Sequence, residues 1–388
     1  MEALKRRVHL RVLAEVPDDA TRDDLAPLVG EYVRSEDPLL PAVVHDRVVA
    51  QLLDEIAGLG PLQPLLDDPT VTEVMVNGGR WVYVERAGRL ERVDVPLDPD
   101  AVVHLVGRVV GPLGLRLDRA SPLVDARLAD GSRLHAVIPP LAVDGPCLSV
   151  RRFPGAPPGI GAFGLPRRAL AYLGWAVTSG ANVVVSGGTS AGKTTLCNAL
   201  AAAIPPTTRV VTIEETAELR LPLPHVVRLE ARPPNAEGAG AVSVRDLVRA
   251  ALRMRPDRIV VGEVRGGEAF DLLQACNTGH DGSLTTVHAN RAAAVPERLG
   301  ALVLVAATGL PLSAVHAQLA TAFDLVVHVA RRAGRRRVET IGEVRRTPRG
   351  VEVVPVFDTV DGTLAAVGEP ARPPRRPDAP PVDPAWFA

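Results

Sequence analysis

Residues 182–200 read NVVVSGGTSAGKTTLCNAL, and this stretch decides the fold of the domain around it. A β-branched run precedes a glycine-rich loop and an apolar, helix-forming run follows it, so the pattern predicts a strand, a loop and a helix in that order. The loop from Gly187 to Thr195 fits GxxxxGK(S/T), in which backbone amides surround phosphate groups at the N-terminus of a helix. The alternative is an accidental glycine-rich turn. Such a turn does not explain why a strand-like run precedes the loop and a helix-like run follows it. We therefore predict a phosphate-binding loop.

Each part of this loop has an expected role. Lys193 reaches the β and γ phosphates of a nucleotide, and the Thr194 hydroxyl helps to hold Mg²⁺. Only Lys5 and Lys193 among the 44 basic residues are lysines, so the chain keeps a lysine where a compact ammonium group must fit a narrow loop, with chance placement as the alternative. We expect ATP and Mg²⁺ as cofactors. The expected nucleotide contacts are Gly187, Gly188, Thr189, Ser190, Ala191, Gly192, Lys193, Thr194 and Thr195.

Strand-like and helix-like runs alternate along the second half of the chain. The short β-rich runs are NVVVSG, RVVTIEE, RIVVGEV, SLTTVHA and DLVVHVA, and helical stretches lie between them. This alternation predicts a sheet covered by helices, that is, an α/β nucleotide-binding domain over residues 167–358.

The first half of the chain is organised differently. Residues 1–60 repeat their apolar positions every three or four residues and predict an N-terminal helical extension. Residues 61–153 alternate with period two around Asn-Gly and Asp-Gly turns and predict a smaller α+β domain. Residues 154–166 are dense in Pro and Gly and predict a linker, where a hinge could lie. Residues 359–388 are rich in proline and poor in apolar residues, and predict a disordered tail.

Composition limits the classes of function. The chain of 388 residues has 46% hydrophobic and 23% charged residues and a formal net charge of -1, which gives no general attraction to nucleic acid. Its three cysteines are scattered and lack a CxxC spacing, so neither a disulfide framework nor a zinc site is indicated. The N-terminus lacks the apolar core of a secretory signal, and we expect a cytoplasmic protein.

One uncharged stretch is long enough to raise the question of a membrane span. No Asp, Glu, Lys or Arg occurs from Leu299 to Phe323, and a span needs only about 20 mostly apolar residues. Gly309 and Pro311 interrupt the stretch. Two buried helices broken near these residues are therefore favoured over a membrane span.

Acidic residues and histidines follow several of the predicted strands. RIVVGE ends in Glu263, and VVTIEE ends in Glu214 and Glu215. A phosphate loop needs a carboxylate at the end of a neighbouring strand to manage the metal and the attacking water, although such a residue is often only a solvated loop charge. His280 and His288 flank another strand-like run, so both could border the same site; a structural or surface role is the alternative for each.

Arginines gather on the last predicted strands of the first domain. Planar guanidinium groups suit the stabilisation of charge on a γ-phosphate, and a solvated basic face is the alternative. The candidates are Arg127, Arg133, Arg151 and Arg152.

Together these residues resemble the secretion superfamily ATPases of type II and type IV systems, and most closely the CpaF-like branch that drives Flp/Tad pili. The matching strings are SGGTSAGKTT, TIEETAELRL, HVVRLEARPPN, RDLVRAALRMRPDRIVVGEVRGGEA, NTGHDGSLTTVHAN and, in the first domain, RLADGSRLHAVIPPLAVDGPCLSVRRF. They span about residues 55–330. The resemblance implies a RecA-like P-loop NTPase domain preceded by a smaller α+β domain.

The resemblance also implies roles for individual residues. It places an acidic box at Glu214 and Glu215, a Walker B glutamate at Glu263, and a histidine box at His280 and His288. Glu214 polarises the attacking water in this scheme. Glu215 stands where relatives commonly have aspartate, which leaves its role open.

Metal and arginine contacts follow from the same resemblance. Thr194 and Glu263 are the expected metal contacts. The family's nucleotide-closing arginines match Arg127, Arg133, Arg151 and Arg152, with Arg228 and Arg232 as further candidates.

The resemblance further implies that the chain works in a larger assembly at the membrane. Such motors are similar to one another in forming hexameric rings on the cytoplasmic face of the inner membrane, where they contact membrane platform proteins. A ring of this kind explains why arginines lie on a separate domain joined by a hinge, since ATP could draw that domain onto a neighbouring subunit.

Other classes of function remain as alternatives. A nucleic-acid translocase or helicase-like ATPase of a conjugation system predicts a basic stripe, yet the sequence offers only RRAGRRR at 331–337, which reads better as a charged hairpin turn, and only 3% aromatic residues for base stacking. A scaffold that binds nucleotide only for assembly does not explain the acidic and histidine positions. A GTPase is disfavoured because no NKxD-type string occurs.

Overall fold

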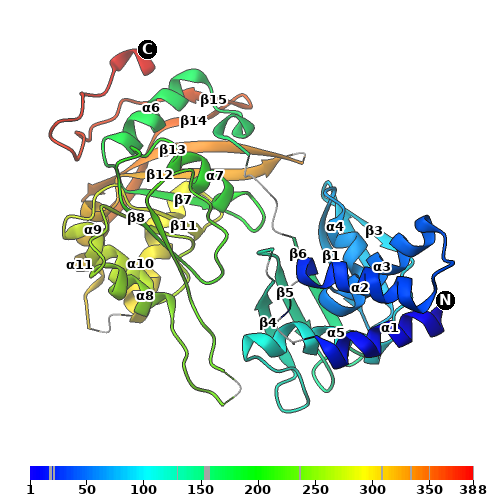
Figure 1. Cartoon of the computed structure of the whole chain (residues 1–388). Coiled ribbons are helices and arrows are strands. Elements are labelled where there is room, and N and C mark those ends of the chain that lie inside the picture. Colours follow the sequence, from blue (N-terminus) through cyan, green and yellow to red (C-terminus); the bar gives the residue numbers. More distant parts are fainter. Residues whose placement is uncertain are drawn as a thin grey trace. The chain divides into compact units, whose positions relative to one another are not determined.

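The computed structural model describes residues 1–16, 20, 22–128, 130–152, 158–235, 237–306, 309–332, 334–348 and 350–387. They form two compact units (Figure 1), whose main parts are Met1–Pro154 and Gly155–Pro234 together with Gly238–Ala388. Each unit is described by itself.

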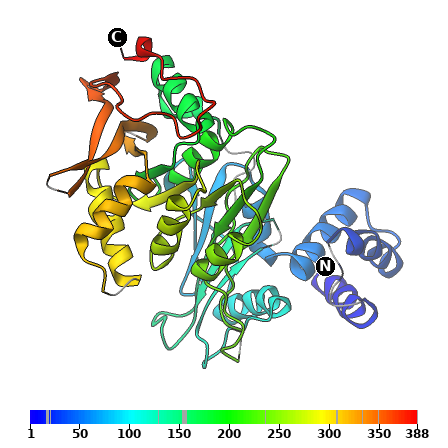
Figure 2. The same cartoon turned by 90° about the vertical axis from the view of Figure 1, so that its left-hand side faces the viewer.

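Three helices open the first unit and confirm the helical reading of the N-terminal residues. They are α1 (Glu2–Glu15), α2 (Arg22–Glu36) and α3 (Ala42–Ala57). Their apolar stripes meet in a small core that includes Val8, Val29 and Leu52, which are fully buried. Figure 2 shows the three helices packed together at the blue end of the chain. Burial of these stripes explains the period of three and four residues in the sequence.

A six-stranded antiparallel sheet follows in the first unit, in the order β3-β2-β1-β6-β5-β4. Apolar side chains alternate along its strands and pack against α5, whose first turn is capped by the Asp98 side chain. This sheet confirms the predicted strands and hairpins. The elements are η1 (Gly60–Leu62), α4 (Gln63–Asp67), β1 (Val71–Asn77), β2 (Trp81–Arg86), β3 (Arg89–Val93), α5 (Pro99–Val110), η2 (Gly111–Leu113), β4 (Leu123–Arg127), β5 (Arg133–Val137) and β6 (Cys147–Arg151).

The second unit is built on a nine-stranded sheet in the order β15-β14-β13-β12-β7-β11-β10-β8-β9. The strands from β12 to β9 in this order are parallel, and β13, β14 and β15 extend the sheet in antiparallel fashion. The five predicted strands are confirmed as β7, β8, β10, β11 and β12, and the charged hairpin turn predicted at 331–337 is confirmed where β12 joins β13. The strand β9 and the full antiparallel extension were not predicted. The bounds are β7 (Val183–Gly187), β8 (Val210–Glu214), β9 (Val226–Glu230), β10 (Arg258–Val261), β11 (Leu284–His288), β12 (Leu325–Arg332), β13 (Arg335–Thr347), β14 (Gly350–Val360) and β15 (Thr363–Ala366).

Helices cover both faces of this sheet. One core lies under α6 and α7, and a second core lies under α8 to α11. Because both faces are covered, the central strands β7, β8 and β10 are buried along their whole length and read as continuous apolar runs. The predicted α/β class is confirmed. The helices are η3 (Ile160–Phe163), α6 (Arg167–Thr178), α7 (Lys193–Ala201), α8 (Val244–Ala251), α9 (Glu268–Asn277), η4 (Ala292–Ala294), α10 (Val295–Ala306), α11 (Leu312–Ala322) and η5 (Pro384–Trp386).

The uncharged stretch from Leu299 to Phe323 forms parts of two helices, α10 and α11. Pro311 is the N-cap of α11, which agrees with the predicted break. Among the described residues no helix is both long enough and apolar enough to cross a membrane.

The predicted linker is partly packed. Its residues up to 157 lie outside the described ranges, but Ile160–Phe163 forms a 3-10 turn and the Phe163 side chain is fully buried in the core beneath α6. The buried Phe163 side chain therefore holds in place the end of a segment that its Pro and Gly content predicts to be a linker with a hinge.

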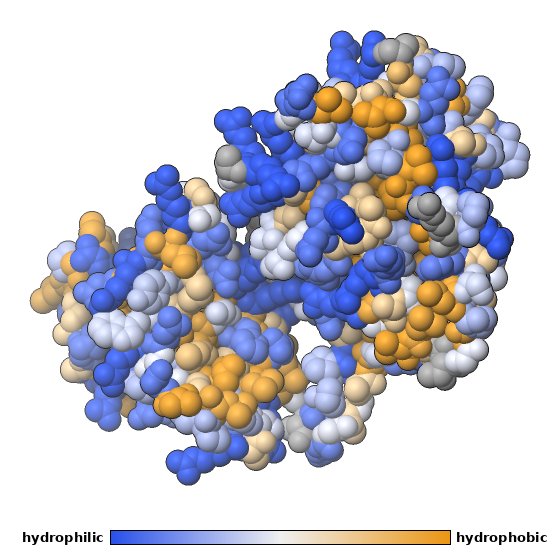
Figure 3. Space-filling model, turned by 180° about the vertical axis from the view of Figure 1, so that it is seen from behind, coloured by the Kyte–Doolittle hydropathy of each residue, from blue (hydrophilic) through white to orange (hydrophobic). Residues whose placement is uncertain are grey.

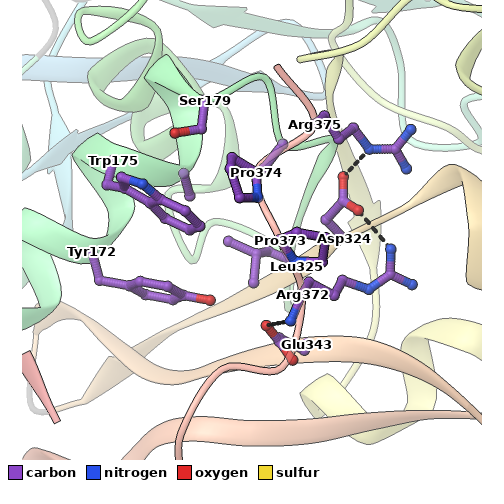
Figure 4. Close-up of a pocket in the computed structure, with 12 residues that line it drawn as sticks. Tyr172, Trp175, Ser179, Asp324, Leu325, Glu343, Arg372, Pro373, Pro374 and Arg375 are labelled. Carbon is purple, nitrogen blue, oxygen red and sulfur yellow. Dashed lines mark hydrogen bonds and ion pairs between the residues drawn. The ribbon is translucent and has the colours of Figure 1, made fainter. Parts of the chain in front are cut away.

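The prediction that residues 359–388 are disordered is wrong for the residues that the structure describes. β14 runs to Val360, and β15 adds a further strand at the sheet edge. Arg372 and Arg375 then pair with the buried Asp324 at 2.6 and 2.5 Å, as Figure 4 shows. The proline content predicted disorder. It does not show that Arg372 and Arg375 pair with a buried carboxylate, Asp324, about 50 residues earlier in the sequence.

The C-terminal segment also covers a pocket of about 290 Å³. Figure 4 shows Tyr172 and Trp175 of α6 on one side of it and Pro373 and Pro374 on the other. The Trp175 indole donates a hydrogen bond to the Pro380 carbonyl at 2.8 Å. The pocket lies beside the starts of β7 and β12, at the edge of the sheet where the parallel strands begin.

Apolar side chains that remain exposed occur on both units. Leu39 and Val143 of the first unit and Val305 of the second are 92%, 91% and 77% exposed. On the face drawn in Figure 3, hydrophobic groups lie among hydrophilic ones on each unit. Exposed apolar residues spread in this way are normal for a protein surface.

Candidate functional site

The phosphate-binding loop lies between β7 and α7, where the central parallel strands end. This confirms the predicted strand, loop and helix. Ser190 and Gly192 adopt φ angles of 57° and 98°, and such left-handed residues help to turn successive amides toward one concave side. Gly187 must be glycine, because a Cβ there would lie 2.3 Å from the Val329 carbonyl oxygen on the adjacent β12.

Lys193 begins α7, and its side chain is turned back into the loop. It is 7% exposed. Its Nζ donates to the Gly188 carbonyl at 3.0 Å and lies 3.1 Å from Nε2 of His288. His288 is the last residue of β11 and is in register with Gly187 of β7. Parallel pairing therefore brings a histidine from 95 residues downstream to the phosphate loop.

Glu263 reaches the same point from the end of β10. Its Oε1 lies 3.0 Å from Nε2 of His288 and 2.8 Å from Nε of Arg265. Arg265 also pairs with Glu215 at 3.0 Å. The structure thus assembles Lys193, His288, Glu263 and Arg265 from three neighbouring strand ends. The sequence analysis missed Arg265, although it follows Glu263 by two residues in the string RIVVGEVR.

Burial sets the charge states in this group. Desolvation lowers the pKa of Lys193, Arg265 lowers it further, and Glu263 opposes the change. Desolvation likewise lowers the pKa of His288, against the attraction of Glu263. His288 is therefore a neutral imidazole at pH 7, and one ring nitrogen can accept a hydrogen bond from the Lys193 ammonium.

Glu214 ends β8 in a buried position beside the group. Its side chain is 4% exposed, and its carboxylate accepts hydrogen bonds from the backbone amides of Glu218 and Leu219 at 2.9 and 3.0 Å. Burial raises the pKa of Glu214 to about 7, although the two backbone donors pull it down. A Cβ on Gly262, the residue before Glu263, would lie 2.7 Å from Cγ of Glu214. Glu214 therefore packs directly behind the strand end that carries Glu263.

Glu215 has a different environment from Glu214. Its side chain is 66% exposed and its described ion-pair partner is Arg265. The two acidic residues that the sequence places together thus divide between the interior and the surface.

His280 lies away from this group. It comes before β11, its Nδ1 is 3.2 Å from the Ala275 carbonyl, and the neighbouring Asp281 pairs with Arg375 of the C-terminal segment. His288 is the last residue of the same strand, which spans about 13 Å from its first residue Leu284. The prediction that both histidines border one site is therefore wrong within this unit, because residues that flank a strand lie at opposite edges of the sheet.

Three of the predicted arginines of the first unit form one row across the sheet. Arg133 pairs in register with Arg127 on β4 and with Arg151 on β6. The fourth, Arg152, has a role inside its own unit, since its Nη1 donates to the carbonyls of Asp68 and Val71 at 2.5 and 2.8 Å. The role of the row toward a nucleotide stays a prediction, whereas Arg152 stabilises the start of β1.

Arg228 and Arg232 are held near the end of β9. Nη2 of Arg228 donates to the Ala217 carbonyl at 3.3 Å, and Nε of Arg232 donates to the Gly240 carbonyl at 2.7 Å. Both contacts order loops of the second unit. These two hydrogen bonds do not join either arginine to the group around Lys193.

The residues present fit a nucleotide with Mg²⁺. The Lys193 ammonium rests on two neutral acceptors, the Gly188 carbonyl and His288, for which phosphate oxygens are stronger substitutes. Oε1 of Glu263 is buried and receives no hydrogen bond of good geometry from the described residues, so it can accept one from a metal-bound water. No group of three His, Cys, Asp or Glu among the described residues could hold a metal alone. That suits Mg²⁺, which binds through few protein ligands and the phosphates.

Comparison with known proteins agrees with this geometry. The family model described as "T2SSE: Type II/IV secretion system protein" matches residues 55–352. The protein named "Putative conjugal transfer protein Rv3659c" of Mycobacterium tuberculosis is 45% identical over 318 residues, covering 79% of this chain and 90% of the relative. The type IV secretion system protein PtlH of Bordetella pertussis is 37% identical over 316 residues, covering 73% and 93%.

A solved structure shares the fold. The crystal structure of the pilus retraction motor PilT with bound ADP superposes with a TM-score of 0.56 at 20% sequence identity, over 74% of this chain and 83% of that chain. The family match and the relatives extend over most of the chain, including both the first-unit sheet and the phosphate loop. The chain belongs to the type II/IV secretion system protein family, and it is a P-loop ATPase of that family.

Proposed function

We propose that the chain is a motor that hydrolyses Mg²⁺-ATP to drive a bacterial secretion, conjugation or pilus machine, and that it belongs to the CpaF-like branch serving Flp/Tad pili. The convergence of Lys193, Glu263 and His288 at the ends of three parallel strands carries this proposal. Ligand sites in open α/β sheets lie at the carboxyl ends of the strands.

The binding step is an exchange of partners at Lys193. Its ammonium leaves the Gly188 carbonyl and His288 and binds the β and γ phosphates, while the loop amides from Gly188 to Thr195 surround them. Thr194 and Glu263 would hold Mg²⁺, which when bound would neutralise part of the phosphate charge. His288, released from Lys193, is then placed beside the γ phosphate and Glu263.

The hydrolytic step needs a base for the attacking water, and Glu214 is our candidate. A carboxyl group whose pKa is about 7 is matched to proton transfer at neutral pH. Its carboxylate must leave the amides of Glu218 and Leu219 to reach the water. Arg265 links Glu263 to Glu215 and keeps both carboxylates in place before nucleotide arrives.

The arginine row of the first unit has its proposed partner outside its own sheet. Arg127, Arg133 and Arg151 carry like charges at directly opposite positions, an arrangement that an anion stabilises. In a hexameric ring, ATP draws this row onto a nucleotide, hydrolysis releases it, and the swing of the first unit does mechanical work. We place the ring on the cytoplasmic face of the inner membrane, against platform proteins of the machine.

A nucleic-acid translocase of a conjugation system is the second candidate, because relatives carry the name conjugal transfer protein. It predicts DNA binding that weakens steeply with salt. Filter binding across salt concentrations separates the candidates, since the motor proposal expects no tight DNA binding.

The experiment that tests the main proposal is Mg²⁺-dependent ATP hydrolysis by the full chain and by Lys193→Ala, with mass photometry on the same samples. We expect hydrolysis that the substitution abolishes, together with a six-subunit species. Lys5→Ala is the matched control, because it removes the other lysine of the chain, which lies between Glu2 and Glu55 in the first unit. Hydrolysis that survives in Lys193→Ala contradicts the site, and hydrolysis by a monomer contradicts the ring.

A further inference from the structure

The hairpin that joins β12 to β13 carries an unusual density of positive charge. We call Arg331, Arg332, Arg335, Arg336 and Arg337 the arginine hairpin. Arg331 lies opposite Arg336 in the strand register, and Arg332 lies opposite Arg335. Within the described part of the hairpin, Glu339 pairs with Arg332 at 2.6 Å. Like charges placed directly opposite each other repel, and an anion bound nearby reduces that repulsion.

The alternation of β13 separates these arginines onto two faces. Val338 is 3% exposed and packs in the same core as Leu196 and Leu200 of α7. Arg336 precedes it by two residues and therefore faces the same side, whereas Arg335 and Arg337 face the other. The face of β13 that packs into this core thus continues, beyond Val338, as the side chain of Arg336.

The direction of Arg336 leads to the start of α7. Gly192 is the N-cap of α7 and the glycine directly before Lys193. A Cβ on Gly192 would lie 2.7 Å from Cδ of Arg336 and 3.0 Å from its Nε. Figure 1 shows β12 and β13 running beside β7 and α7. The Arg336 side chain therefore lies against the phosphate loop at the helix end that attracts anions.

We propose that Arg336 is a nucleotide-contacting residue that binds the phosphates of ATP in its own subunit. The inference rests on the proposed function of the same site. A guanidinium group beside the loop forms charge-assisted hydrogen bonds with phosphate oxygens, and the bound phosphates offset the repulsion within the arginine hairpin. Arg336 thereby adds a fixed positive charge from the antiparallel extension of the sheet, in addition to Lys193 and to the arginines of the first unit.

Contact between Arg336 and the phosphates accounts for two observations. Gly192 lacks a side chain where Arg336 lies, and the hairpin concentrates arginines next to the loop that receives the triphosphate. A packing role alone would use only the methylene groups of Arg336, and a shorter or uncharged side chain of similar shape would serve it equally.

The test is the binding of N-methylanthraniloyl-ATP to the full chain, followed by fluorescence at low and at moderate salt. The variants are Arg336→Gln, Arg336→Lys and, as the matched control, Arg346→Gln. Arg346 is exposed on the same strand, about 33 Å away along it, and its loss changes the net charge equally. We expect Arg336→Gln to weaken binding about tenfold or more, Arg336→Lys to recover part of the affinity, and Arg346→Gln to stay within about twofold of the wild type.

Two further measurements separate the role of Arg336 from a folding defect and from a failure of the proposed function. The affinity of Arg336→Gln falls less steeply with salt than that of the wild type, which a merely shifted loop does not produce. Lys193→Ala abolishes binding if the phosphate loop is the site. Loss of binding in Lys193→Ala together with equal affinities for Arg336→Gln and Arg346→Gln overturns the role of Arg336 alone, whereas unchanged binding in Lys193→Ala overturns the proposed function.

Discussion

Substitution of Glu214 by glutamine makes the ATPase unit more stable at neutral pH, by an amount that depends on pH. Glu214 is 4% exposed, and burial is the largest influence on its pKa, ahead of the backbone donors at Glu218 and Leu219 and the charges of Glu218 and Arg228. An ionised carboxylate in this position lacks water, whereas a neutral amide of the same shape still accepts the backbone hydrogen bonds. The substitution therefore removes a desolvation cost and keeps the contacts.

The magnitude follows from the two pKa values. The native pKa of about 7 lies above the ordinary glutamate pKa of 4.5. Between these values the native state keeps the proton that the unfolded chain has lost, so the contribution of Glu214 to stability falls as pH rises from about 4.5 to about 7. The difference of about 2.5 units corresponds to about 3 kcal/mol. Glu214→Gln has no such loss, so its stability relative to the wild type rises by about 3 kcal/mol over that range.

The assay is differential scanning calorimetry of both proteins from pH 4.5 to pH 8. For a unit of roughly 230 residues, 3 kcal/mol corresponds to about 6–12 °C in the melting temperature of the transition that nucleotide shifts. Glu215→Gln is the control, because that side chain is exposed and its substitution gives a difference that varies little with pH. A Glu214→Gln difference that stays constant with pH refutes the reasoning, because the backbone donors then outweigh burial and Glu214 is ionised throughout.

Three further predictions concern the phosphate-binding loop, the C-terminal segment and Glu263. Gly187→Ala lowers the free energy of unfolding by about 2 kcal/mol in denaturant titrations, because its Cβ meets a backbone oxygen of β12, while Gly188→Ala changes it by less than about 0.5 kcal/mol. Arg372→Ala lowers it by about 3 kcal/mol and opens the C-terminal segment to limited proteolysis, since the buried Asp324 loses a partner; protection equal to the wild type contradicts this. Glu263→Gln keeps N-methylanthraniloyl-ATP affinity and lowers steady-state hydrolysis about a hundredfold or more, because an uncharged amide holds Mg²⁺ poorly, and hydrolysis equal to the wild type contradicts the role of Glu263 at the metal.

Sequence patterns predicted most of the sheet that carries the site, because buried parallel strands show as continuous apolar runs. β7, β8, β10, β11 and β12 all follow this rule. β9 did not stand out, since its residues are only partly buried at the sheet edge, and β13 to β15 were missed because their arginines and half-buried residues break the apolar pattern. Edge and antiparallel strands depend on neighbours that a local pattern does not contain.

The site was predictable where chemistry is local and less so where it depends on register. The phosphate loop could be read from one string of residues. The meeting of His288 with Lys193 depends on the pairing of β11 with β7, and the separation of His280 from His288 depends on which end of β11 each one occupies. Arg336 belongs to this second class, because its position beside Gly192 follows from the pairing of β12 with both β7 and β13.

The scarcity of lysine gives the chain a built-in chemical probe. Lys5 is held between Glu2 and Glu55 in the first unit, and the only other lysine is Lys193 in the phosphate loop. The lowered pKa of Lys193 raises the fraction of its neutral, nucleophilic amine, so small acylating reagents react there in preference to an ordinary lysine. In the proposed site bound phosphates cover that amine, so the rate of acylation at Lys193, measured by peptide mass spectrometry, reports the average fraction of sites that hold nucleotide without any engineered label.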